Sequence, residues 1–256
     1  NSAGTSTIGN GYAGISMVAA SDNTTIGGTA VGAGNVISGN GHEGIFMLAC
    51  SNNIIQGNYI GINPAGNGTY GNSHEGIYMY GSSFNTIGGT SAAARNIISG
   101  NMHQGMVMNA GSNNNTISGN YFSLNAEGNA KLNNNWSNIM IISSTGNTVG
   151  GTTAGERNVI AGSNYDGVEF SSASGNTVIG NYIGTNAAGT VALGVGRIGI
   201  YAYGGSNNNI LGGSASGMGN VVSGGNQEGI CVDASTGTRI QGNYIGTTAD
   251  GTAGLG

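Results

Sequence analysis

The sequence predicts an all-β parallel β-solenoid of about eight coils, with roughly 31 residues and three short strands in each coil. Two observations lead to this class. A Gly-(Ile/Val/Met)-x-apolar pattern recurs along the whole chain, and an Asn followed by two apolar residues recurs with it. Units this short cannot bury an apolar face alone, so they must stack on one another. Glycine supplies 53 of the 256 residues, which argues against a helical protein.

Each coil is predicted to hold three extended segments separated by glycine-rich corners. The first segments start at Gly14, Gly44, Gly76, Gly105, Asn138, Gly167, Gly199 and Gly229. The second segments are centred on Ile26, Ile55, Ile87, Ile117, Val149, Val178, Leu211 and Ile240. The third segments follow Asn35, Asn58, Asn96, Asn120, Asn158, Asn181, Asn220 and Asn243. The spacing of these asparagines alternates, so two coils with different loops form a double repeat of roughly 62 residues.

Alternation along the first segment assigns its inward and outward side chains. The predicted core column is Ile15, Met17, Ile45, Met47, Ile77, Met79, Met106, Met108, Ile139, Ile141, Val168, Phe170, Ile200, Ala202, Ile230 and Val232. The asparagines before the third segments lie above one another, so we expect a structural ladder of amide hydrogen bonds between coils. A partial second ladder is predicted at Asn53, Asn85, Asn115, Asn147, Asn176 and Asn209.

Several short strings in these segments resemble a known class of proteins. TIGGT, NVISGN and GNYIGT are similar to the repeats of right-handed parallel β-helix proteins, the pectate-lyase-like solenoids. They look most like the regular repeats of secreted bacterial surface proteins, and the resemblance covers the whole chain. It implies a single-stranded right-handed parallel β-helix. It does not imply one activity, because enzymes, adhesins and phage tailspikes share this fold.

Charge and hydropathy exclude some partners. The formal charge of −5 and the pI near 4.9 leave no cationic surface for phosphates, so no nucleic-acid partner is expected. No stretch approaches the roughly 18 apolar residues of a membrane helix, so no membrane span is expected. Few lysines and abundant Ser, Thr, Asn and Gly favour an exported protein, located outside the cell or on its surface.

The chain is predicted to form one solenoid domain over residues 1–256, made of about four double repeats without visible caps. Asn1–Thr5 resembles the loops Asn186–Thr190 and Thr248–Thr252, so both ends fall inside one loop type. We expect a segment of a longer surface protein or a filament subunit, because open strand edges invite pairing. Cys50 and Cys231 are predicted to lie far apart, which excludes an internal disulfide, and Cys231 is expected to face outward, where it could bridge chains.

The outward positions of the first segment are unusually apolar. One column is Ser16, Phe46, Tyr78, Val107, Met140, Glu169, Tyr201 and Cys231, and the next is Val18, Leu48, Tyr80, Asn109, Ile142, Ser171, Tyr203 and Asp233. A third column precedes the segment: Tyr12, His42, His74, His103, Trp136, Tyr165, Arg197 and Gln227. Exposed apolar patches usually mark contact surfaces. Three interpretations stay open: a loop covers this face, a protein packs on it, or a polysaccharide stacks on its rings.

Three histidines of this face, His42, His74 and His103, are predicted to stack in consecutive coils beside Glu43 and Glu75. Imidazoles and carboxylates on adjacent coils can converge on a metal ion. Repetition alone, however, also stacks identical residues. We therefore assign no metal site and expect no cofactor, and the lack of an Asp-rich loop disfavours calcium.

A catalytic site should appear as a local break in the repeat. The best break places Asp166, Glu169 and Arg197 on adjacent coils, where two acids and one arginine are weak catalytic candidates; a surface ion pair explains the same residues. A second break is the segment 133–138, which contains Trp136. This segment is either a platform that binds sugars or a divergent coil. The chain carries no GxSxG, HExxH or P-loop motif.

The sequence thus favours a structural or adhesive β-solenoid without catalysis, in a filament or a cell-surface repeat. It would self-associate or bind another surface protein through the aromatic face. The alternative is a carbohydrate-binding or polysaccharide-degrading module, a lyase or a hydrolase. The predicted binding face consists of Tyr12, His42, Phe46, His74, Tyr78, Tyr80, His103, Trp136, Tyr165, Tyr201 and Tyr203.

Overall fold

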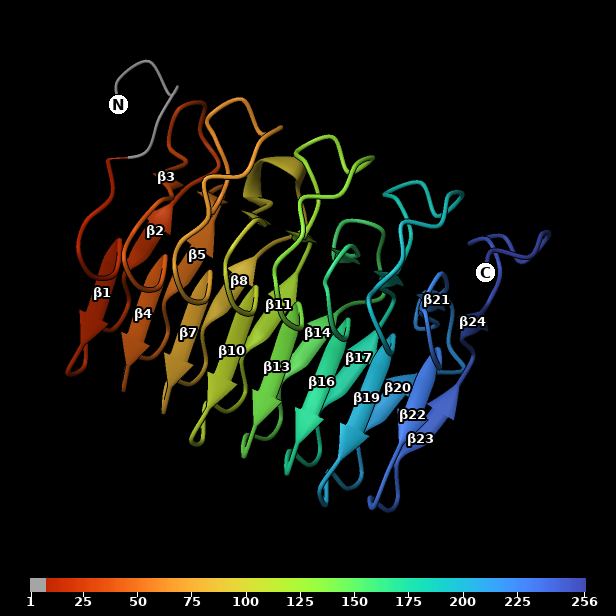
Figure 1. Cartoon of the computed structure of the whole chain (residues 1–256). Coiled ribbons are helices and arrows are strands. Elements are labelled where there is room, and N and C mark those ends of the chain that lie inside the picture. The colour runs from red at the N-terminus through yellow and green to blue at the C-terminus, as the bar shows by residue number, and fades with distance from the viewer. Residues whose placement is uncertain (1–7) are drawn as a thin grey trace.

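Short extended segments joined by tight corners wrap into a parallel β-helix in the computed structural model, which describes residues 8–256. Each coil contributes one strand to each of three parallel sheets, and every sheet has eight strands in order along the chain. Figure 1 shows the coils side by side from the first strands to the last. The predicted fold class is confirmed. Residues 1–5, for which a repeat of the loop sequence was noted, lie outside the described part.

Sheet A contains the first strand of each coil, and coils are numbered 1–8 by these strands. They are β1 (Ile15–Val18), β4 (Ile45–Leu48), β7 (Ile77–Tyr80), β10 (Met106–Asn109), β13 (Ile139–Ile142), β16 (Val168–Ser171), β19 (Ile200–Tyr203) and β22 (Ile230–Val232). Sheet A lies at the front of Figure 1. Each strand begins directly after the Gly or Asn that opens the repeat, as predicted.

Sheet B contains the second strands, β2 (Thr25–Gly27), β5 (Ile54–Gln56), β8 (Thr86–Gly88), β11 (Thr116–Ser118), β14 (Thr148–Gly150), β17 (Thr177–Ile179), β20 (Ile210–Gly212) and β23 (Arg239–Gln241). Sheet C contains the third strands, β3 (Val36–Ile37), β6 (Tyr59–Ile60), β9 (Ile97–Ile98), β12 (Tyr121–Phe122), β15 (Val159–Ile160), β18 (Tyr182–Ile183), β21 (Val221–Val222) and β24 (Tyr244–Ile245). A single turn of 3₁₀ helix, η1 (Ala92–Ala94), lies in the loop between β8 and β9.

The strands stack in register, so equivalent residues form columns. Ile15 partners Ile45, which partners Ile77, and the same alignment continues to β22. The predicted inward column is buried in coils 2–7, whereas Ile230 and Val232 in coil 8 are partly open. Columns from all three sheets meet in one continuous apolar core. Burial of this core is the main stabilising term for units that cannot fold singly.

Both predicted asparagine ladders are present. In the first, Asn120 donates from Nδ2 to Asn158 Oδ1 at 3.1 Å and accepts from Asn96 Nδ2 at 2.9 Å. The second ladder links the predicted positions from Asn53 to Asn209 in the same way. The ladder side chains of the middle coils are fully buried, so each amide satisfies polar groups that water does not reach.

A third ladder was not predicted from the sequence. It joins Asn10, Asn40, Asn72, Asn101 and Asn134 by side-chain hydrogen bonds between successive coils. Each of these asparagines stands four residues before the start of a sheet A repeat, which is a signal that the spacing contained. No Asn occupies this offset in coils 6–8, so the column is broken and harder to see.

Two glycines show why the corners exclude other residues. Gly88 has φ +90, and a Cβ there would lie 2.0 Å from Ser118 O in the next coil. Gly184 has φ +80, and its Cβ would lie 1.7 Å from Ser223 O. Both positions combine a left-handed backbone with a close approach of the next coil, and only glycine accommodates this combination.

A second small core covers the outer side of sheet C. Loops that begin after β6, β12 and β18 fold back on themselves, as the antiparallel bridges Ile62–Thr69, Leu124–Lys131 and Thr185–Ala192 show. The buried members of this core are Ile62, Ile97, Tyr121, Leu124, Val159 and Ala161. One interpretation of the sequence was that a loop covers the aromatic face, which belongs to sheet A. In the structure, the loops form a second core on sheet C.

Two further features concern cysteines and membranes. Cys50 is buried, Cys231 is partly exposed on sheet A, and both are free thiols. The orientation predicted for Cys231 is therefore confirmed.

Within residues 8–256, no helix has the length and apolar character that a membrane crossing requires.

Candidate functional site

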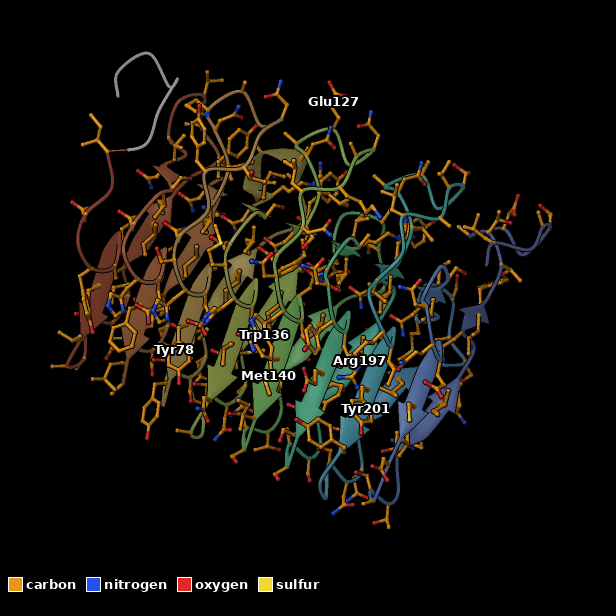
Figure 2. The ribbon with its side chains drawn as sticks, viewed as in Figure 1. Tyr78, Glu127, Trp136, Met140, Arg197 and Tyr201 are labelled. Carbon is orange, nitrogen blue, oxygen red and sulfur yellow. The ribbon has the colours of Figure 1, made fainter. Side chains whose placement is uncertain are left out.

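The outer face of sheet A carries the aromatic and histidine columns predicted from the sequence. Figure 2 shows Tyr78, Trp136, Met140, Arg197 and Tyr201 along this face, where they belong to coils 3, 5 and 7. The predicted face residues are half-buried or exposed, apart from Val107. Val107 is only 3 % exposed, because the larger side chains of Tyr78 and Met140 flank it in the neighbouring strands. Its predicted exposure is therefore wrong.

The column that precedes the strands forms a continuous ladder of rings. Centroids are 4.2 Å apart between Tyr12 and His42, and 4.6 Å apart between His42 and His74. The ladder continues through His103 and Trp136 and ends where Trp136 stacks on Tyr165 at 4.9 Å with an interplanar angle of 10°. Cross-coil ring contacts of this kind stabilise the stack. Two pairs in this column, His42–His74 and Trp136–Tyr165, thus cover ring faces with neighbouring rings, and the other contacts are tilted or edge-on.

The outward columns of the strands carry further aromatic pairs. Phe46 stacks on Tyr78 at 6.1 Å, and Tyr201 stacks on Tyr203 at 4.7 Å. Beside the first pair lie the exposed side chains of Val18, Leu48 and Tyr80 in coils 1–3. We call Val18, Phe46, Leu48, Tyr78 and Tyr80 the apolar patch.

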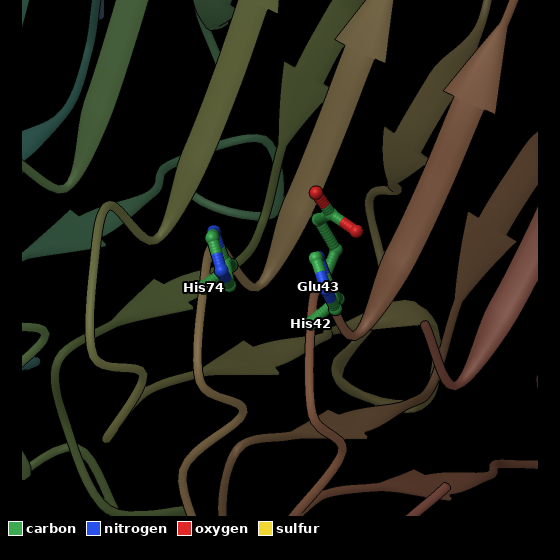
Figure 3. A group of neighbouring side chains, drawn as sticks. All are labelled: His42, Glu43 and His74. Carbon is green, nitrogen blue, oxygen red and sulfur yellow. The ribbon is translucent and has the colours of Figure 1, made fainter. Parts of the chain in front are cut away.

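Two overlapping groups of possible metal ligands lie in coils 2–4. His42, Glu43 and His74 form one group, and His74, Glu75 and His103 form the other. In each group the nearest ligand atoms lie within 4.8 Å of one another. Figure 3 shows the Glu43 carboxylate beside the two imidazoles of the first group. These donor types suit first-row transition metals such as copper or zinc.

The three weak catalytic candidates converge as predicted, but each is held by the fold. Asp166 is buried, and its Oδ1 accepts the Ile198 N–H at 3.0 Å and lies 3.7 Å from Arg197 Nε. Burial raises the pKa of the Asp166 carboxyl above its ordinary value. Glu169 accepts from Ser137 Oγ at 2.6 Å through Oε2 and from the Tyr203 hydroxyl at 3.0 Å through Oε1.

Burial also raises the pKa of the Tyr203 phenol, and the nearby Glu169 carboxylate adds to the shift. Arg197 lies over the rings of Tyr165 and Tyr201, 5.5 Å and 5.9 Å from their centroids. Arg197 thus ends the ring ladder as a cation above an aromatic face. Contacts within the protein thus hold Glu169 and Arg197, whereas Asp166 Oδ2 is buried and makes no hydrogen bond within the described residues.

Sequence reasoning missed two arginines that support the loops over sheet C. The Arg95 guanidinium lies 4.0 Å from the Tyr121 ring centroid, and the Arg157 guanidinium lies 3.9 Å from that of Tyr182. Their Nε atoms also donate to the carbonyl oxygens of Gly119 and Gly180. The sequence signal was present, since each arginine directly precedes a ladder asparagine, Asn96 or Asn158.

Comparison with known protein families shows to which family this chain belongs. The family described as periplasmic copper-binding protein (NosD) matches residues 2–155. The chain belongs to the NosD family. The matched range includes coils 1–4, and therefore both groups of possible metal ligands in this NosD-family chain. No curated protein sequence matches it.

Two of the solved structures similar to this NosD-family chain are epimerases. The crystal structure of a mutant of the periplasmic alginate epimerase AlgG has a TM-score of 0.63 and 14% sequence identity, with 91% of this chain and 47% of AlgG covered. The AlgE6 A-module, a mannuronan C-5 epimerase of Azotobacter vinelandii, has a TM-score of 0.46 and 16% identity over 90% of this chain and 58% of the module. The chain thus spans about half the length of AlgG. At these identities the likeness concerns the fold alone.

Proposed function

We propose that this chain is a non-catalytic binding module of the cell exterior that self-associates through sheet A. The observation that supports this proposal is the apolar patch. Val18, Leu48 and Tyr80 are 46%, 38% and 45% exposed, and they lie side by side on paired strands. Contiguous apolar and aromatic surface of this kind is typical of protein contacts.

A second copy of the chain is the partner that fits the patch. The protein has a net charge of −5, whereas the five patch residues carry no charge. Two copies can therefore approach through this surface without placing carboxylates of the patch against each other. Pairing of the same patch on both copies is the usual arrangement of a twofold dimer.

Ring geometry favours a protein partner over a polysaccharide. Sugars stack on ring faces that point to solvent, but His42 stacks on His74 and Trp136 stacks on Tyr165 along the solenoid. Phe46 and Tyr78 are likewise stacked on each other. The alternative of a polysaccharide-binding module therefore has less free ring surface than the sequence suggested.

The contacts of the acidic residues support a role without catalysis. A polysaccharide hydrolase needs two carboxylates that face its substrate. Here Asp166 is buried against Ile198 and Arg197, and both Glu169 oxygens accept hydrogen bonds from Ser137 and Tyr203.

Sedimentation velocity over a concentration series tests self-association. The unmodified chain should form dimers or larger species as the concentration rises, and the double variant Leu48→Ser/Tyr80→Ser should remain monomeric. Val191→Ser removes an equally exposed apolar side chain away from sheet A and should associate like the unmodified chain. A chain that stays monomeric up to the highest concentration reached, or a double variant that associates normally, would contradict the proposal.

We also propose copper binding as a second function of this NosD-family chain. The family description names copper, and coils 2–4 bring three imidazoles and two carboxylates together. Imidazole and carboxylate oxygen are ligands that copper(II) accepts. Titration of the full chain with copper(II) chloride tests this function. The proposal would be refuted if the chain bound copper(II) no more tightly than the buffer components do.

A further inference from the structure

The two groups of possible ligands in coils 2–4 differ in whether their carboxylate already has a partner. Glu75 Oε1 lies 3.4 Å from His103 Nδ1, and the Glu75 side chain is only 12% exposed. Glu43 Oε2 is buried and makes no hydrogen bond within the described residues. A buried carboxylate oxygen without a partner loses its hydration without compensation. The Glu43 carboxylate is therefore the one of the two that still has a buried oxygen available to a cation.

We propose that His42, Glu43 and His74 form the copper(II) site of this chain, and that Glu75 and His103 lie outside it. This inference rests on the proposed copper-binding function and assigns it to three residues. It also differs from what the repeat alone suggests, since repetition places a His–Glu pair in both coils 2 and 3.

The backbone holds the two imidazoles of this site in place. The His74 N–H donates to His42 O at 3.3 Å, and the next residues pair in register as β4 and β7. The rings are parallel within 3° and 4.6 Å apart between centroids, and Figure 3 shows Glu43 beside His42 with His74 on the neighbouring turn. One ligand atom from each of the three side chains lies within 4.8 Å of the others. Because strand pairing fixes these positions before any ion arrives, little ordering is needed on binding.

The donor set favours copper(II) or zinc over copper(I). Copper(I) prefers soft sulfur ligands. Cys50 is buried in the interior, where its thiol is directed to Leu48 O at 3.2 Å, and Cys231 lies in coil 8. Neither thiol belongs to the cluster, which consists of nitrogen and oxygen donors.

A bound ion would join two coils by side-chain ligands. His42 and Glu43 precede strand β4 of coil 2, and His74 precedes β7 of coil 3. The site therefore connects residues that the sequence separates by a whole coil. Binding should stabilise these coils, because an ion that binds only the folded state shifts unfolding to higher denaturant.

The decisive comparison is between Glu43→Gln and Glu75→Gln in the full chain. Each variant removes one carboxylate charge from coils 2–4, so the nonspecific attraction of cations to this region falls by the same amount in both. Titration calorimetry with copper(II) chloride should show at least about tenfold weaker binding for Glu43→Gln and a change within about threefold for Glu75→Gln. Circular dichroism of the metal-free proteins checks that both remain folded.

Electron paramagnetic resonance of the copper(II) complex gives an independent measurement. The unmodified chain should show nitrogen coupling from both imidazoles, His42→Asn should lose one, and His103→Asn should keep both. His42→Asn also serves as the test variant if Glu43→Gln does not fold. Copper binding that survives in Glu43→Gln and His42→Asn, or that is lost in Glu75→Gln or His103→Asn, would overturn the assignment while leaving copper binding intact. A complete absence of binding by the unmodified chain would overturn the proposed copper function itself.

Discussion

Removing one amide of the first asparagine ladder should show how much these side chains stabilise the stacked coils. Asn120 makes five side-chain hydrogen-bond contacts: the two hydrogens of Nδ2 are shared among Ile87 O, Ser118 O and Asn158 Oδ1, and Oδ1 accepts from Asn96 N and Nδ2. Asn120 is fully buried, so water cannot replace these partners without an opening of the coil. Asn120→Ala removes all five bonds at once.

The loss expected for Asn120→Ala is about 3–5 kcal/mol of unfolding free energy. Each net hydrogen bond contributes about 0.5–1.5 kcal/mol, and a buried donor left without a partner costs about 1–3 kcal/mol. The donors left in this way are the backbone N–H of Asn96 and one hydrogen of its Nδ2. Asn243 at coil 8 is less buried and makes three such bonds, so Asn243→Ala should cost about 1–2 kcal/mol.

Urea unfolding followed by circular dichroism measures both losses. The two variants delete the same chemical group from the same column, which makes Asn243→Ala the matched control. Unfolding of a solenoid can proceed coil by coil, so midpoints and slopes should be compared together. Equal losses for the two variants, or a loss below about 1 kcal/mol for Asn120→Ala, would refute the view that buried ladder amides stabilise the stack.

Three further changes have predicted outcomes. Burial raises the folded-state pKa of Asp166, so the contribution of its carboxyl to stability is greatest at acid pH and is lost as pH rises through that pKa. Asp166→Asn should therefore be more stable than the unmodified chain at pH 7 but not at pH 3.5, as measured by the urea midpoint. Gly184→Ala should cost more than about 3 kcal/mol, whereas Gly205→Ala, at φ +82 with open space around its Cβ, should cost about 1–2 kcal/mol in the same assay. Arg95→Ala should lower stability by about 1 kcal/mol through loss of its contact with Tyr121, by thermal unfolding.

The fold could be predicted from the sequence because the columns of a solenoid are columns in the aligned repeats. The starts of β1 to β22 and the inward side chains followed from glycine spacing and strand alternation. The asparagine columns followed for the same reason. The third ladder was missed because its asparagines stop after Asn134, and an interrupted column does not stand out in the repeat.

The site could be predicted only as a set of neighbouring columns. The sequence placed the rings of Tyr12 to Tyr165 above one another, but it could not show which pairs stack and which are tilted, since side-chain torsions are not set by spacing. It also could not show that Asp166 turns inward to the Ile198 N–H, or that Asp166 and Glu43 each keep one buried oxygen without a hydrogen bond. Both depend on side-chain length and on the loops that pack nearby.

The ladders also have a direction. Along all three, the Nδ2 of one coil donates to the Oδ1 of the next, so the side-chain amide dipoles align along the solenoid axis and polarise one another. The first ladder runs through all eight coils, so the stack presents the acceptor oxygen of Asn35 toward one end and the donor Nδ2 of Asn243 toward the other. Two such end faces complement each other only in head-to-tail order. An assembly that extended the ladders would be a polar fibre, with a growing end chemically unlike its opposite end.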